Sequence, residues 1–97
     1  MSQTPEGKVK DRVKKLLKEY GAYYHMVVTN GMGAPTLDFI GCFNGWFFAV
    51  EAKAGNKQMT DRQELTAFDM REAGGTVFLI NDETGVEPLK HWLEENK

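Results

Sequence analysis

An Asn-Gly pair at positions 44–45 lies between two apolar, aromatic-rich runs and predicts a tight β-hairpin. This dipeptide favours a two-residue type I′ turn, because both central residues must adopt a positive φ. The turn sets the register: Phe43 pairs with Trp46, and at the other end of the hairpin Asp38 lies opposite Glu51. A bulge or a longer loop would change this pairing.

The open end of the hairpin collects charged residues. Opposed side chains share one face of a sheet with Cβ atoms about 4.5–5.5 Å apart, so the carboxylates of Asp38 and Glu51 repel each other. Residues 46–50 include no polar residue and predict a central strand covered on both faces, where an acidic end is costly. Strand alternation places Lys53 on the face of Glu51. We expect the three side chains to form one cluster.

Carboxylate oxygens at this spacing suit a hard divalent cation such as Mg²⁺ or Mn²⁺, and the chain lacks the Cys/His cluster typical of zinc sites. Such a cation can polarise a phosphoryl oxygen and lower the pKa of a bound water, while Lys53 positions the water or offsets developing charge. Alternatively, Lys53 only neutralises two acids at a solvated sheet edge. The apolar strand and the E-x-K spacing favour a site for metal-assisted phosphate chemistry.

The N-terminal segment predicts a helix up to about Tyr20, with Thr4 as N-cap, Pro5 in the first helical position and Gly21 at the end. Its apolar stripe should face the sheet, and Glu6 shares the phase of that stripe. Glu6 has a second explanation, as a first-turn acid favoured by the helix dipole. The opposite face should carry the basic residues, which serve either phosphate binding or plain solvation: Lys8, Lys10, Arg12, Lys14, Lys15 and Lys18.

The rest of the chain alternates strands and helices. A strand is expected over 22–28, followed by a glycine-rich loop over 29–35 that could touch a substrate. A second helix should begin at Thr60, with Gln63 completing a capping box, and end at 74–75. Further expectations are a buried parallel strand over 76–80, a turn over 81–85 and a terminal helix from about Pro88. Side chains expected to pack inward are Cys42, Leu65, Phe68, Ala73, Leu89, Trp92 and Leu93, with a dimer surface as the alternative for Trp92.

This order of elements predicts an α/β domain with a mixed four-stranded sheet flanked by helices, and the length of 97 residues suits a single domain, 1–97. The formal net charge of −2 requires any contact with DNA to come from local patches. No run approaches the roughly 20 apolar residues of a membrane helix, and no signal pattern opens the chain, so we expect a cytoplasmic protein.

Several of these residues, in this order, resemble a nuclease family. The series Glu6, 33–35 (Gly-Ala-Pro), Asp38, Glu51-x-Lys53, Thr60-x-x-Gln63 and 73–75 (Ala-Gly-Gly) is similar to the VRR-NUC family, in the short stand-alone form found in phages and bacteria. This family belongs to the restriction-endonuclease-like PD-(D/E)xK nucleases. The likeness covers about residues 6–80. It departs from the family at 36–37, two residues that separate the proline from Asp38.

The resemblance implies a restriction-endonuclease-like core and a metal-dependent DNA endonuclease, acting as a homodimer on branched DNA such as Holliday junctions. It assigns Mg²⁺ or Mn²⁺ binding to Glu6, Asp38, Glu51 and the Ala52 carbonyl. It assigns catalysis to Asp38, Glu51, Lys53 and Gln63. Two alternatives are a catalytically inactive nucleic-acid-binding module on the same fold, and a small protein-binding adaptor without a metal.

Overall fold

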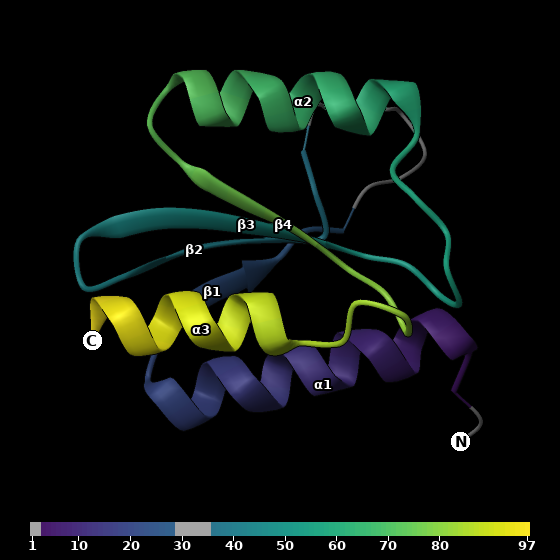
Figure 1. The fold of residues 1–97 in the computed structure, drawn as a ribbon, viewed down its shortest axis with the longest axis horizontal. Coiled ribbons are helices and arrows are strands. Elements are labelled where there is room, and N and C mark those ends of the chain that lie inside the picture. Colours follow the sequence, from purple (N-terminus) through teal and green to yellow (C-terminus); the bar gives the residue numbers. More distant parts are fainter. Residues whose placement is uncertain (1–2, 29–35) are drawn as a thin grey trace.

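The computed structural model describes residues 3–28 and 36–97 (Figure 1). The loop expected over 29–35 lies outside the described residues. The elements are α1 (Pro5–Tyr20), β1 (Tyr23–Met26), β2 (Phe39–Phe43), β3 (Trp46–Ala52), α2 (Asp61–Glu72), β4 (Thr76–Ile80) and α3 (Glu87–Asn96). The predicted α/β order, helix, three strands, helix, strand, helix, is confirmed.

The four strands form one mixed sheet in the order β1-β2-β3-β4. β1 pairs with β2 and β2 with β3 in antiparallel fashion, whereas β4 runs parallel to β3 because α2 carries the chain back across the sheet. The predicted hairpin register is confirmed from the Phe43–Trp46 pair to the Phe39–Val50 pair. Both turn residues have positive φ, 54° at Asn44 and 92° at Gly45, as a type I′ turn requires.

Helices cover the two faces of the sheet unequally. α1 and α3 lie against one face and α2 lies against the other (Figure 1). The larger core forms on the α1/α3 side, where both helices turn fully buried aliphatic side chains toward Phe39, Phe48 and Val50. Trp92 of α3 packs there too, with its ring centroid 5.6 Å from that of Phe48. The inward orientation predicted for the apolar residues of α3 is therefore confirmed.

The α2 face has a smaller core, and the packing predicted for three residues of this region is wrong. α2 directs Thr66 and Ala67 at the sheet, whereas Leu65 and Phe68 are 63% and 57% exposed. Ala73 is also exposed and follows the last residue of the helix. The reason is geometric: side chains spaced as residues 63, 66, 67 and 70 share one helix face, and residues 65 and 68 lie outside it.

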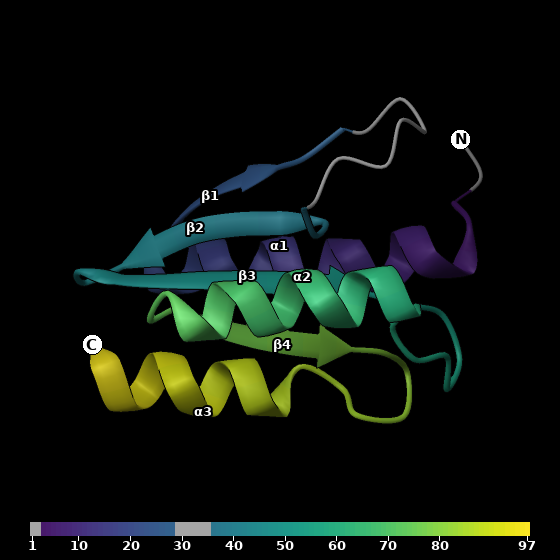
Figure 2. The same ribbon diagram turned by 90° about the horizontal axis from the view of Figure 1, so that it is seen from above.

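Cys42 is exposed, so its predicted packing is wrong as well. On β2 it lies beside Tyr23 of β1 and Phe47 of β3, on the face of the sheet that α2 covers. α2 lies over β3 and β4 and does not extend to β1 (Figure 2). Tyr23 and Phe47 are 69% and 41% exposed, so this part of the sheet is open.

None of the helices in residues 3–28 and 36–97 combines the length and the apolar character needed to cross a membrane.

Candidate functional site

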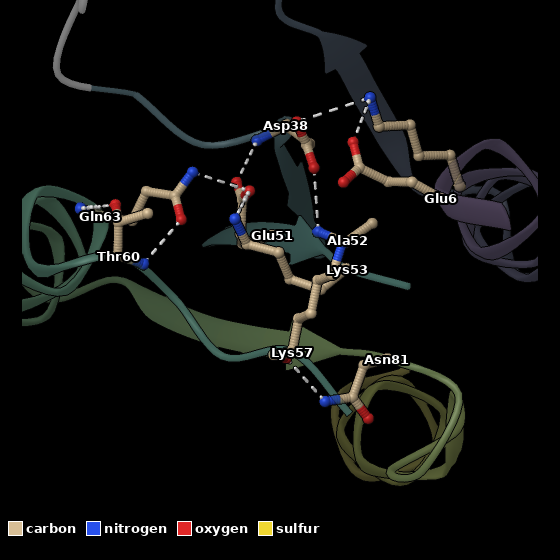
Figure 3. Close-up of polar contacts among 10 residues, drawn as sticks. Glu6, Asp38, Glu51, Ala52, Lys53, Lys57, Thr60, Gln63 and Asn81 are labelled. Carbon is tan, nitrogen blue, oxygen red and sulfur yellow. Dashed lines mark hydrogen bonds and ion pairs between the residues drawn. The ribbon is translucent and has the colours of Figure 1, made fainter. Parts of the chain in front are cut away.

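Asp38 and Glu51 lie opposite each other where β2 begins and β3 ends, as the hairpin register predicts (Figure 3). The backbone N–H of Asp38 donates to Oε1 of Glu51 at 3.1 Å. In return, Oδ2 of Asp38 accepts the backbone N–H of Ala52 at 2.9 Å. Each carboxylate is thus held by the backbone of the other strand, which gives the acidic pair a defined geometry.

Glu51 is the more deeply buried of the two acids, with 4% of its surface exposed. The pKa of Glu51 is raised from 4.5 to about 7, chiefly by burial and next by the negative charge of Asp38, while Lys53 acts in the opposite direction. Near neutral pH the protonated and ionised forms of this carboxyl group are therefore both populated. A cation placed beside the pair would offset both the energetic cost of burying the ionised Glu51 and its repulsion by Asp38.

Lys53 follows the last residue of β3 and contacts Glu51. Its Nζ lies 3.5 Å from Oε2 of Glu51, and only 15% of its side chain is exposed. Its backbone N–H donates to the carbonyl of Ile80 at 2.9 Å, which ties it to the end of β4. The predicted cluster of Asp38, Glu51 and Lys53 is present in the structure (Figure 3).

Gln63 reaches this cluster from the first turn of α2. Its Nε2 donates to Oε2 of Glu51 at 3.0 Å. Gln63 also completes the predicted capping box: its side-chain Oε1 accepts the backbone N–H of Thr60, and its backbone N–H donates to Oγ1 of Thr60. The capping role and the site role are therefore both present in one amide.

Glu6 lies beside the cluster at the first turn of α1, and a lysine separates it from the other acids. Nζ of Lys10 lies 3.5 Å from Oε2 of Glu6 and 3.7 Å from Oδ1 of Asp38. Only 29% of the Lys10 side chain is exposed, so the prediction that Lys10 belongs to the solvated basic face is wrong. The sequence held the signal: Lys10 follows Glu6 by four residues and precedes the buried Val13 by three, which places it on the inward stripe.

The loop after Lys53 is held by the turn that follows β4, a support that the sequence did not reveal. Asn81 is 1% exposed, and its Nδ2 donates to the carbonyl of Lys57 at 3.0 Å (Figure 3). Asp82 and Gly55 exchange two hydrogen bonds, of 2.9 and 2.7 Å. These contacts fix the path of the chain from Lys53 to Lys57.

The oxygen donors at this site suit a hard divalent cation. Asp38 and Glu51 supply two adjacent carboxylates, and Mg²⁺ is commonly bound by one or two carboxylates with water in its remaining positions. Within residues 3–28 and 36–97, no three His, Cys, Asp or Glu side chains gather as a ready-made metal site, and Glu6 is kept apart by Lys10. The residues that fit a metal are therefore the Asp38–Glu51 pair.

The chain matches no model of a known protein family, and no curated protein is significantly similar to it in sequence. A relationship to the VRR-NUC family is therefore a proposal that rests on the sequence resemblance alone.

Proposed function

We propose that this protein is a metal-dependent DNA endonuclease that hydrolyses phosphodiester bonds. The observation that carries the proposal is the cluster in which Asp38 and Glu51 exchange backbone contacts while Glu51 also contacts Lys53. Burying carboxylates that repel each other contributes little to stability. The same arrangement is well suited to binding a cation and stabilising negative charge on a phosphate.

Asp38 and Glu51 would hold Mg²⁺ or Mn²⁺, with the Ala52 carbonyl and Glu6 as further ligands. When bound, the ion polarises a phosphoryl oxygen and makes water a stronger acid. The ammonium of Lys53 is positioned at the same end of β3 to orient the attacking water and to offset charge that develops on the phosphate. Gln63 does not need to touch the substrate, because its hydrogen bond to Oε2 keeps the Glu51 carboxylate in place.

The substrate and assembly follow from the resemblance to the stand-alone VRR-NUC proteins. It supports branched DNA, such as Holliday junctions, as the substrate, and a homodimer whose two sites cut both strands. With an overall charge of −2, the protein would attract DNA through local basic groups near the site, such as Lys53 and Lys57.

A cleavage assay tests this function directly. Labelled four-way junction, flap, single-stranded and plain duplex DNA are incubated with the protein and Mg²⁺ or Mn²⁺. The variants are Lys53→Met and Glu51→Gln, with Lys90→Met as a matched loss of one positive charge on α3, on the other side of the sheet. We expect metal-dependent cutting, fastest on the junction, that both site variants lose by a factor of roughly 100 or more and the control keeps.

The alternative is a catalytically inactive nucleic-acid-binding module on the same fold. It would bind DNA equally well with and without metal, cut none of the four substrates, and tolerate Glu51→Gln. An adaptor without nucleic-acid function would bind neither metal nor DNA. Either result would overturn the endonuclease proposal.

A further inference from the structure

The ammonium group of Lys10 occupies a position between two carboxylates of the site. It lies 3.5 Å from Oε2 of Glu6 and 3.7 Å from Oδ1 of Asp38, and it comes from α1, whereas Asp38 precedes β2. The other oxygen of Asp38, Oδ2, is already engaged by the backbone N–H of Ala52. Oδ1 is therefore the Asp38 oxygen available to a cation, and Lys10 is next to it.

A lysine and a divalent cation compete when they use the same carboxylate oxygen. Two positive charges within about 4 Å of one oxygen repel each other, so a cation that binds Oδ1 must move the ammonium away. Lys10 can move, because its charge is carried on a flexible four-carbon stem and part of the side chain is exposed. Partly exposed ion pairs of this kind are weak, so a metal can displace the lysine.

We propose that Lys10 is the built-in counter-ion of the Glu6–Asp38 carboxylates and that the metal must displace it in order to bind. This inference rests on the proposed function, since it concerns the same metal site. Lys10 keeps the acidic site neutralised while no metal is bound, and it lowers the affinity for the metal. Displacement would also free the Glu6 carboxylate from the ammonium group that now contacts it.

The test is a titration with Mn²⁺, in which the free ion is measured by electron paramagnetic resonance at about pH 8, where carboxylates are ionised. The variants are Lys10→Met and Lys14→Met. Lys14 is the matched control, since it lies one turn further along α1 and pairs with Asp11. Loss of two partly exposed ion pairs should make Lys10→Met bind Mn²⁺ roughly three- to tenfold more tightly, and the control should change by less than about twofold.

Asp38→Asn removes a proposed ligand and is the loss-of-site control: it should weaken Mn²⁺ binding in both the wild-type and the Lys10→Met backgrounds. Equal Mn²⁺ affinities for Lys10→Met and Lys14→Met, or weaker binding by Lys10→Met, would overturn this inference and leave the proposed function standing. A wild-type protein with no Mn²⁺ binding that depends on Asp38 would overturn both. Circular dichroism melts confirm that each variant is folded.

Discussion

Gln63 connects the start of α2 to Glu51 through a single amide group. Its Nε2 donates to Oε2 of Glu51 at 3.0 Å, and its Oε1 accepts the backbone N–H of Thr60 at 3.0 Å. The position of α2 and the orientation of the buried carboxylate are therefore coupled. Any change at residue 63 affects a helix cap and the acidic site together.

Replacing Gln63 separates these two effects when it is compared with Thr60→Ala. Thr60→Ala removes the N-cap hydroxyl that accepts the N–H of Gln63, and it should cost about 1 kcal/mol of stability while the contact to Glu51 remains. Gln63→Ala should lower stability by a similar amount, about 1 kcal/mol, and should also slow cleavage roughly tenfold or more. Urea unfolding and single-turnover cleavage measure the two quantities. Equal cleavage rates for both variants would show that the hydrogen bond from Gln63 to Glu51 does not contribute to cleavage.

Glu51 should make the stability of the metal-free protein depend on pH. Its pKa is raised from an ordinary value of 4.5 to about 7, chiefly by burial. The folded state therefore binds the proton more tightly than the unfolded state, so this group stabilises the fold fully below about pH 4.5 and loses that contribution as the pH rises through 7.

The measurement is the urea midpoint of wild type and Glu51→Gln between these two pH values. The stability of the wild type relative to Glu51→Gln should fall as the pH increases, because the glutamine cannot ionise. Adding Mn²⁺ above neutral pH should restore the stability of the wild type and leave the stability of Glu51→Gln unchanged. A difference that stays constant with pH would show that Glu51 ionises without penalty.

Asn81, in the turn after β4, should stabilise the loop that carries Lys53 and Lys57. Its amide donates to the carbonyl of Lys57, and its Oδ1 accepts the backbone N–H groups of Glu83 and Thr84. Asn81→Ala leaves these groups without their buried partner and should lower the free energy of unfolding by about 1–3 kcal/mol. Asn56→Ala, in the exposed part of the same loop, is the control and should be within about 0.5 kcal/mol of wild type.

The effect on the loop can be followed by hydrogen exchange. The amide of Gly55, which donates to Oδ2 of Asp82, should exchange faster in Asn81→Ala than in Asn56→Ala. An unchanged exchange rate at Gly55 would show that Asn81 stabilises only the turn after β4 and not the loop after β3.

Gly41 should tolerate no side chain, because β1 and β2 approach closely at this position. A Cβ built on Gly41 would lie 2.1 Å from the carbonyl oxygen of Tyr23 and 2.9 Å from Cα of Tyr24. Gly41→Ala should therefore displace β1 and destabilise the protein by about 2 kcal/mol or more. The neighbouring Cys42→Ala changes an exposed residue and should have little effect in the same thermal melts.

The acidic pair could be predicted from the sequence because it depends on local rules. The Asn-Gly turn needs two positive φ angles, and this requirement sets the pairing of every residue along the hairpin up to Phe39 and Val50. Strand alternation then places Asp38, Glu51 and Lys53 together. The caps of α1 and α2 could also be predicted, since Thr4, Gly21 and Thr60 form their capping hydrogen bonds with residues only a few positions away.

What the sequence left undecided depends on where neighbouring elements begin and end. Leu65 and Phe68 are apolar, but α2 turns the smaller Thr66 and Ala67 to the sheet, and Cys42 is exposed because α2 does not reach β1. The partnership of Lys10 with Asp38 also required α1 and β2 to meet, as Asn81 required the turn after β4 to meet the loop after β3. The sequence determined the backbone geometry of the acidic pair, because turns and alternation are local, and the tertiary structure alone decided which distant side chains surround it.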